Sequence, residues 1–309
     1  MPEQLRRKQH LVSKGYQRNF ADGEVVSVLD AHTGRVVWAR RSIQTNWRAE
    51  NFLSVVGPEG QVDDSLEREF GQSEGVFLKI VREIRLNKPL TPAQKSALDA
   101  LAATHALRSR AFALAHHDVV ASTVAQLTPD LIEDQLAIGL LAQELGRPPY
   151  PGELEDRVAA QADHFAARPD LFASGLRRSL TDLKKFFAKT TVQLVGSTED
   201  LPGFILPDHP VVHGKRDEGR FGFHNGGAIG DADTIVLPIS RRLVAFYSSK
   251  HSWDVQIRTK RGVRWVNALL LLGAQSEVAC HPADVQETNR LIRDRNLYPP
   301  EKFDTIFIH

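Results

Sequence analysis

Cysteine and long apolar runs are nearly missing from this chain. Of its 309 residues, one is cysteine, Cys280. A single cysteine excludes a disulfide framework within the chain and is typical of a reducing compartment. The longest apolar run, VNALLLLGA from Val266, is about half the length that spans a bilayer. The amino-terminal MPEQLRRKQH has charges but no apolar run after them, which argues against a signal peptide. We therefore expect a cytoplasmic protein.

A large net charge of either sign is also missing. The formal net charge is +1 at pH 7, so the chain as a whole does not have the character of a polyanion binder. Charge is nevertheless uneven, because residues 59–83 are mainly acidic and residues 241–264 mainly basic. The two regions either cancel each other inside the protein or leave the basic one facing a polyanion such as nucleic acid. An ordinary solvated surface with salt bridges is the third alternative.

The periodicity of apolar residues changes from that of strands to that of helices near residue 63. EVVSVLD and RVVWARR alternate apolar and polar residues around the turn AHTG, which predicts a β-hairpin with Gly34 at positive φ. Residues 63–87 carry an apolar stripe of helical period. The sequence therefore begins with strands and then enters a helical block.

Two Thr-Pro pairs, at 91–92 and 128–129, are typical helix starts, with threonine as N-cap and proline in the first turn. The first predicts a long helix to about Leu127, and the second predicts another that Gly146 ends. Two more helices follow by residue 188, and strand-like segments then dominate. We predict an α+β fold for the single domain 1–309, with a helical insertion over roughly 62–189. The N-terminal hairpin and the C-terminal β-rich segment are expected to join in one sheet.

The opening stretch QHLVSKGYQRNFA resembles the start of a bacterial family, domain of unknown function 4238. The matching residues are His10, Tyr16, Arg18, Asn19 and Phe20. Three later segments fit the same family in the same order: VVSVLDAHTGRVV, LEREFGQSEGVF, and GFILPDHPVV with DTIVLPISRRLVAFY.

The chain also departs from that family's pattern. Ser13 stands where proline is usual, Gln17 where leucine is usual, and Pro207 where serine is usual. The last difference puts in doubt a hydroxyl group acting beside the following aspartate. The resemblance implies an α+β bacterial cytosolic protein and implies no settled activity.

Two glutamates of the predicted acidic helix form a candidate metal site. Glu67 and Glu74 are seven residues apart, so both lie near one edge of the apolar stripe. With Asp208 they offer an oxygen-rich site for a divalent ion, Mg²⁺ or Mn²⁺. The alternative is that these carboxylates pair with arginines of neighbouring helices, such as Arg82 or Arg108.

Arg108 lies beside the apolar stripe of the long helix, three residues after His105. A buried arginine is costly unless it is paired, so either a carboxylate or a bound phosphate is required. Asp208 and His209 follow a predicted strand, which is a common position for site residues. The alternative there is a turn, in which the aspartate accepts backbone N–H groups.

These residues support two hypotheses. In the first, His10, Arg18, Asn19, Arg108, Asp208 and His209 form a polar centre with the metal-binding glutamates. The protein is then a phosphodiester hydrolase of nuclease type, with His10 as general base, and a defence or toxin role fits such an enzyme. In the second, the polar centre is a structural network, and the protein is a non-catalytic module that binds nucleic acid or a protein. Carboxylates that converge on an open cleft favour the enzyme, whereas carboxylates already paired with arginine favour the binder.

Overall fold

The computed structural model describes residues 8–50, 55–56, 62–63, 65–81, 83–86, 88–166, 169–215, 220–221, 229–248 and 255–299. The fold is α+β, as predicted. Its helices are α1 Lys14–Gln17, α2 Ser65–Val81, α3 Pro92–Leu107, α4 Arg110–Glu133, α5 Gln135–Leu145, α6 Glu153–Ala166, α7 Pro169–Lys189, α8 Lys260–Leu271 and α9 Val285–Arg293. Short 3₁₀ segments are η1 Arg18–Phe20, η3 Ile229–Asp231, η4 Pro282–Asp284 and η5 Arg295–Leu297.

The strands form two main sheets, and the predicted joining of the N-terminal hairpin with C-terminal strands occurs in one of them. The four-stranded sheet has the order β3–β2–β14–β8, and the six-stranded sheet has the order β10–β9–β11–β12–β7–β13. The bounds of the first sheet are β2 Val25–Asp30, β3 Val36–Ser42, β8 Leu206–Pro207 and β14 Glu277–Cys280. Those of the second are β7 Thr191–Ser197, β9 Val212–Lys215, β10 Arg220–Phe221, β11 Thr234–Ser240, β12 Leu243–Ser248 and β13 Val255–Ile257. Two short pairs complete the set: β1 Lys8–His10 with β4 Arg48–Glu50, and β5 Val55–Val56 with β6 Val62–Asp63.

The N-terminal hairpin does join the C-terminal part of the chain, although only in the smaller sheet. Strands β2 and β3 form the predicted hairpin, and Gly34 in its turn has a φ of 73°. Strand β2 then pairs with β14 in antiparallel fashion, from Ser27 opposite Cys280 to Asp30 opposite Glu277. Pairing of β2 with β14 joins the N-terminal hairpin to the C-terminal part of the chain.

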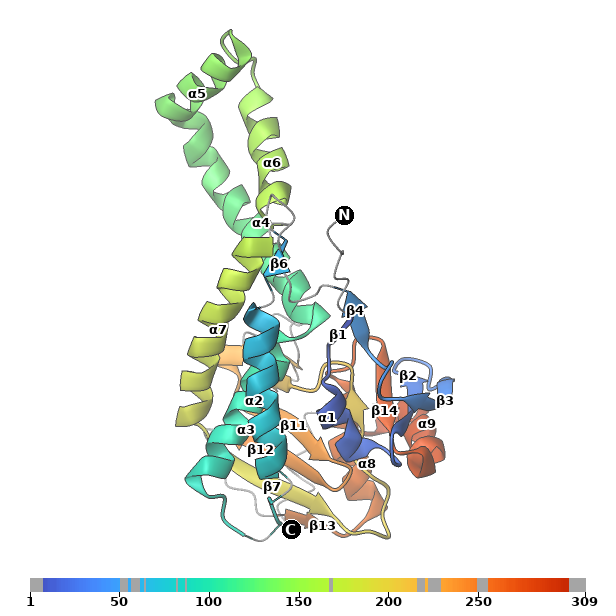
Figure 1. Ribbon diagram of the computed structural model, residues 1–309. Coiled ribbons are helices and arrows are strands. Elements are labelled where there is room, and N and C mark those ends of the chain that lie inside the picture. Colours follow the sequence, from blue (N-terminus) through green and yellow to red (C-terminus); the bar gives the residue numbers. More distant parts are fainter. Residues whose placement is uncertain are drawn as a thin grey trace, which may run out of the picture.

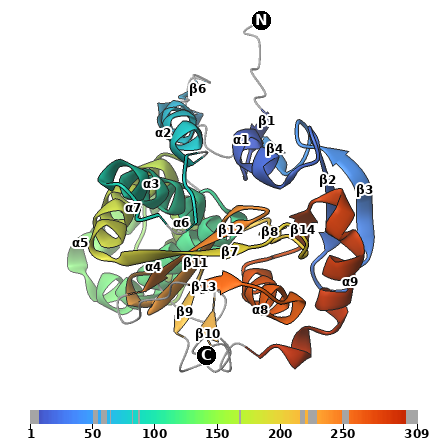
Figure 2. The same cartoon turned by 90° about the horizontal axis from the view of Figure 1, so that it is seen from below.

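The six-stranded sheet separates two hydrophobic cores (Figure 2). Successive side chains of a strand point to opposite faces, and β11 follows this rule. Leu237 packs in the core that includes Leu101 of α3, whereas Val236 packs in the core that includes Val266 of α8. The central helices therefore cover one face of the sheet, and α8 covers the other.

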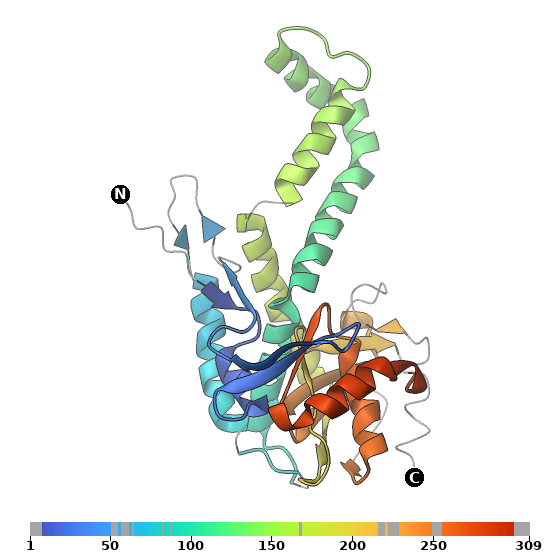
Figure 3. The same cartoon turned by 90° about the vertical axis from the view of Figure 1, so that its right-hand side faces the viewer.

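Helices α4, α5 and α6 project from the body as an arm (Figures 1 and 3), which we call the helical arm. Its start differs from the prediction of one long helix to about Leu127. The chain turns at Arg108, with φ −82° and ψ 55°. Ser109 then caps α4 by accepting a hydrogen bond from the N–H of Phe112 at 3.1 Å. The break directs α4 away from the body.

The second Thr-Pro pair lies inside α4 and does not begin a helix, contrary to the prediction. Thr128 Oγ1 donates to Val124 O at 2.9 Å, which is the bond a hydroxyl makes within a helix. Asp134 caps α5 instead, accepting from the N–H of Leu136 at 2.7 Å. An aspartate one residue after α4 offers a side-chain acceptor to the free N–H groups of the next helix, and it defines the corner between them.

The corner between α5 and α6 is also built from specific contacts. Gly146 ends α5 as predicted, with a φ of 68°. Arg147 forms two hydrogen bonds with the Glu153 carboxylate at 2.8 and 2.6 Å, and its guanidinium lies 4.2 Å from the ring centre of Tyr150. The bonds from Arg147, together with one from the N–H of Tyr150, lower the pKa of Glu153 to about 2. Both corners of the helical arm are therefore fixed by local side-chain bonding.

Candidate functional site

Five side chains from three helices meet at the interface of α1, α2 and α3, and we call them the polar centre. They are Tyr16, Glu67, Glu74, His105 and Arg108. The 17 residues of α2 place both glutamates on the edge that faces α3, because residues seven apart lie two turns apart on one face. Arg108 stands directly after α3, where the chain leaves helical geometry.

Arg108 binds both glutamates. Its Nη1 donates to Glu74 Oε1 at 3.0 Å, and its Nη2 donates to the two oxygens of Glu67 at 3.0 and 3.1 Å. The guanidinium is 3% exposed and the Glu74 side chain 11%, whereas Glu67 is 27% exposed. Of the two alternatives predicted for Arg108, the structure contains the carboxylate pair. The buried cation is thus neutralised by the protein itself.

Burial shifts the pKa values of Glu74 and His105 in opposite directions. It raises the pKa of Glu74, and the nearby Arg108 opposes that rise. Burial, together with smaller contributions from Arg108 and His209, lowers the pKa of His105 to about 3. Its ring stacks on Tyr16 with ring centres 4.7 Å apart. His105 is therefore a neutral, stacked imidazole near pH 7.

His10 lies at the edge of this cluster. Its Nε2 is 3.2 Å from Gln44 O, and Arg48 Nε donates toward the same nitrogen at 3.4 Å. Burial lowers the pKa of His10, and Arg48 and Arg108 contribute in the same direction. His10 is half-buried and Arg48 is exposed, so this edge is where the cluster approaches solvent.

Two residues predicted for the polar centre lie elsewhere. Arg18 forms an exposed ion pair with Glu24, with Nη2 and Oε1 2.6 Å apart. Asn19 Nδ2 donates to Ile239 O at 3.2 Å, and its carbonyl accepts from Arg241 N at 3.0 Å. The structure therefore does not bring them to Arg108. Asn19 instead ties the N-terminal segment to the end of β11.

Asp208 accepts backbone N–H groups, as in the alternative prediction, but these belong to a distant segment and not to its own turn. Its carboxylate accepts from the backbone N–H groups of Gln275, Ser276 and Glu277 at 2.8, 2.9 and 3.1 Å. Ser276 Oγ donates to it as well. Among the described residues, no three His, Cys, Asp or Glu side chains are placed to hold a metal ion. The predicted site of Glu67, Glu74 and Asp208 is thus not assembled.

His209 is the one residue of the Asp208 pair that approaches the polar centre. It is buried, and its proximity lowers the pKa of His105. Arg82 lies outside the described residues, so the predicted pairing of Arg82 with the glutamates concerns a part of the chain that the structure leaves undescribed.

The basic segment 241–264 uses three of its arginines inside the protein. Arg241 pairs with Asp284 at 2.8 Å, and Arg264 pairs with Glu287. Arg242 donates to the carbonyl oxygens of residues 199, 201 and 202 at 2.9, 2.6 and 3.2 Å. Carboxylates therefore neutralise two of the basic residues of this segment, Arg241 and Arg264.

Sequence reasoning did not find the strained residue next to the cluster. Trp47, just before β4, has a φ of 50°, in the left-handed region that bulky residues rarely adopt. Its Nε1 donates to Glu277 Oε2 at 2.9 Å, and its carbonyl accepts from Leu11 N at 2.9 Å. Two long-range hydrogen bonds stabilise this conformation, and nothing in the local sequence predicts them.

The apolar end of the helical arm was also missed. Leu136 and Leu140 on α5 are 71% and 59% exposed, and Tyr150 is 65% exposed. A signal was present in the sequence, since residues 135–143 contain no charged side chain.

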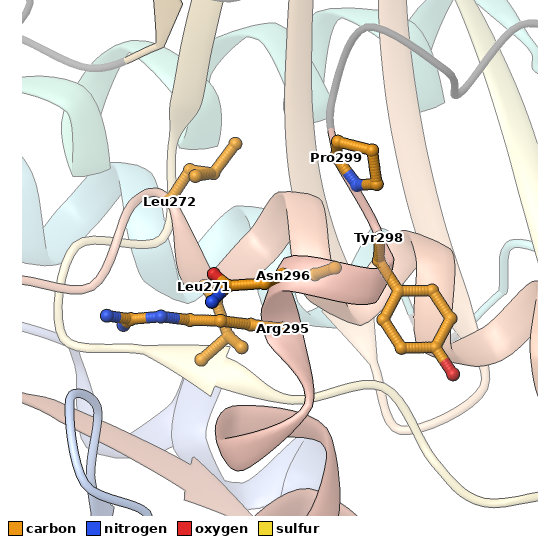
Figure 4. A pocket seen from close by; sticks show the side chains of 7 residues that line it. Leu271, Leu272, Arg295, Asn296, Tyr298 and Pro299 are labelled. Atoms are coloured by element: carbon orange, nitrogen blue, oxygen red, sulfur yellow. The ribbon is translucent and has the colours of Figure 1, made fainter.

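A pocket of about 320 Å³ lies between the end of α8 and η5 (Figure 4). Its walls are mainly aliphatic and aromatic, with Leu271 and Tyr298 among them. The Arg295 guanidinium points away from Tyr298 and donates to Ala31 O at 3.5 Å. The pocket shares no lining residue with the polar centre.

The fold and the site define an α+β protein with a closed polar centre and a projecting helical arm. The chain belongs to the family described as "Protein of unknown function (DUF4238)", whose model matches residues 8–284. No curated protein matches the chain, and no solved structure does. Over the described residues, no helix combines the length and the apolar character needed to cross a membrane.

Proposed function

We propose that this protein is a non-catalytic protein-binding module and that the helical arm carries its binding surface. The observation behind the proposal is a contrast between the two parts of the molecule. Leu136, Leu140 and Tyr150 are 59% to 71% exposed at the far end of the arm. The charged groups of the polar centre face one another.

The polar centre supports a structural role. Arg108 is bound by Glu67 and Glu74, and Asp208 is bound by three backbone N–H groups. A catalytic carboxylate or a phosphate-binding arginine needs a face open to substrate. Buried charges that satisfy one another fix the geometry of a core instead.

The helical arm supports a binding role. Clusters of exposed large apolar side chains mark interaction sites on proteins. Asp134 and Gly146 fix the ends of α5, and Leu141 is its one buried side chain among the described residues, so this apolar helix is held in place largely by its corners. A helix displayed in this way loses little conformational entropy when a partner covers it.

Phosphodiester hydrolysis is the second candidate. The edge formed by His10 and Arg48 favours it, because a half-buried neutral imidazole next to an exposed guanidinium suits a general base beside a phosphate. Of the two glutamates of the polar centre, Glu67 is the more exposed, at 27%, and is the one that a substrate could reach.

The experiment compares capture by the full-length tagged protein and by two variants in an extract of its source cells. Leu136→Gln with Leu140→Gln removes the apolar face and keeps helix propensity. Leu297→Gln is the matched control, since Leu297 is 70% exposed on the body. We expect a discrete partner with the wild type and the control but not with the double variant. Equal capture by all three contradicts the proposal.

A parallel assay tests the second candidate. Purified protein is incubated with labelled DNA and RNA, with and without Mg²⁺ or Mn²⁺, beside a His10→Gln variant. We expect no cleavage. Cleavage that depends on His10 would identify the protein as a hydrolase.

A further inference from the structure

The far end of the helical arm is acidic as well as apolar. Residues 127–146 contain four acidic residues and no lysine, arginine or histidine. Apolar contact alone does not select the partner of such a surface, because the negative charges around it favour a positively charged partner.

The apolar side chains lie on defined helix faces. Leu127 and Leu131 are four residues apart on α4, and they are 50% and 37% exposed. Leu136 and Leu140 are four residues apart on α5. Residues at this spacing lie on one face of a helix, one turn apart. Each helix therefore presents a short exposed apolar stripe, and α5 lies at the far end of the arm (Figure 1).

Two of the four acidic residues are left without an ion-pair partner or a capping role in the described part of the chain. Glu144 pairs with Arg157 of α6, and Asp134 caps the N-terminus of α5. Asp130 and Glu133 are exposed and make no ion pair with any residue that the structure describes. Asp130 is one residue before Leu131, so negative charge borders the apolar stripe of α4.

This charge disfavours several occupants. Nucleic acid and anionic membranes carry the same sign of charge and are repelled. A second copy of the chain docked tip to tip would bring like charges together. A positively charged partner with its own apolar stripe satisfies both features.

We propose that the tip of the helical arm binds an amphipathic α-helix of a partner protein, with lysine or arginine flanking its apolar stripe. This inference rests on the proposed function of the arm and names the partner's chemistry. The 11 residues of α5 span about 16 Å, which matches three turns of a bound helix. Leu136 and Leu140 contact its apolar stripe, and Asp130 and Glu133 face its basic flank.

The test measures fluorescence anisotropy of two synthetic 18-residue peptides with the full-length protein. One is an amphipathic helix of leucine and lysine, and the other has glutamate in place of every lysine. We expect the lysine peptide to bind at least ~10-fold more tightly, since one fully apolar contact and one charge pair together exceed about 1.4 kcal/mol. Raising the salt concentration should weaken its binding.

Variants separate the two contributions. Leu136→Gln with Leu140→Gln should reduce lysine-peptide affinity at least ~10-fold. Asp130→Asn with Glu133→Gln should reduce it severalfold and flatten its salt dependence. Leu297→Gln is the apolar control, and Glu199→Gln with Asp200→Asn removes two exposed carboxylates of the body. Neither control should change the affinity.

Four results would overturn the inference. They are equal binding of the two peptides, tip variants that bind like the wild type, binding to phosphatidylcholine–phosphatidylserine vesicles through Leu136 and Leu140, and a dimer in sedimentation that those substitutions dissociate. Capture from the extract that needs these leucines, without lysine-peptide binding, refutes the partner class and leaves the binding function in place. If the protein neither captures a partner through these leucines nor binds the lysine peptide, the binding function is refuted as well.

Discussion

Arg108 illustrates, at the scale of one residue, what a buried charge requires of its neighbours. It is 3% exposed, and Glu67 and Glu74 on α2 provide its counter-charges. Such a pair contributes little net stability compared with apolar residues of the same volume, but removing one partner leaves the other charge buried and unpaired. The side chain is therefore sensitive to substitution even without a catalytic role.

Replacing Arg108 with methionine should lower the free energy of unfolding by about 3–5 kcal/mol, because both glutamates then lose their counter-charge. Urea denaturation measures this change. Arg18→Met is the control: it breaks the exposed pair with Glu24 and should cost no more than about 1 kcal/mol. A loss below about 1 kcal/mol for Arg108→Met would show that the polar centre does not support the fold.

His105 makes stability depend on pH. Its pKa is about 3 in the folded protein against 6.5 for an ordinary histidine. Between these values the unfolded chain binds one more proton at this side chain than the folded protein. Stability must therefore fall as the pH falls from about 6.5 toward 3, by about 1.4 kcal/mol per pH unit from this group.

The variant His105→Leu removes that titration. Between pH 6 and pH 4, the stability of the wild type relative to His105→Leu should fall by about 1.4 kcal/mol per pH unit. Urea denaturation at several pH values measures the difference. His117→Leu, at an exposed position of α4, is the control. Parallel pH profiles for wild type and His105→Leu would contradict the assigned burial.

At the scale of elements, the helical arm depends on its corners. Gly146 has a φ of 68°, and a Cβ added there meets no atom within 4 Å. Any cost of Gly146→Ala is therefore backbone strain, expected at about 1 kcal/mol. Gly139 lies inside α5 and is equally open. Gly139→Ala should stabilise α5 by about 0.5–1 kcal/mol.

Hydrogen exchange of the α5 amides distinguishes these two glycines. Protection should fall in Gly146→Ala and rise in Gly139→Ala, although both substitutions add the same methyl group in open space. The same sign of change in both variants would mean that the corner does not control α5.

The limits of sequence prediction are clearest where two local signals compete. Thr91 with Pro92 caps α3 as predicted, with the complete capping box that includes Gln94. The same signal at 128–129 does not cap a helix, because α4 already runs through it and Asp134 offers the side-chain acceptor at the actual corner. A capping motif predicts the start of a helix only when no earlier helix continues through it.

Among the site residues, the ion pairs between helices could be predicted from the sequence. The contacts that depend on the order of strands in a sheet could not. The helical positions of Glu67, Glu74 and Arg108 indicated that they could meet, and they do. Asp208 binds residues 275–277, which lie almost 70 positions later in the chain. Only the antiparallel pairing of β8 with β14 brings that backbone to it.

At the scale of the whole molecule, the polar centre and the arm tip should be separable. The polar centre links α1, α2 and α3 within the body, whereas Leu136 and Leu140 are exposed side chains of α5. Helix α5 belongs to the arm that projects from the body (Figure 3). Exposed side chains away from caps and ion pairs usually change stability by about 0.5 kcal/mol or less. Stability and binding should therefore respond to different substitutions.

We expect a double dissociation between the two sets of variants. Arg108→Met should lower the denaturation midpoint and leave lysine-peptide affinity unchanged at temperatures where the protein is folded. Leu136→Gln with Leu140→Gln should leave the midpoint nearly unchanged and abolish that affinity. Circular dichroism and fluorescence anisotropy on the same samples measure both properties. If Arg108→Met weakens binding while the fold is intact, the polar centre acts on the binding surface, and the division into a structural body and a binding arm is wrong.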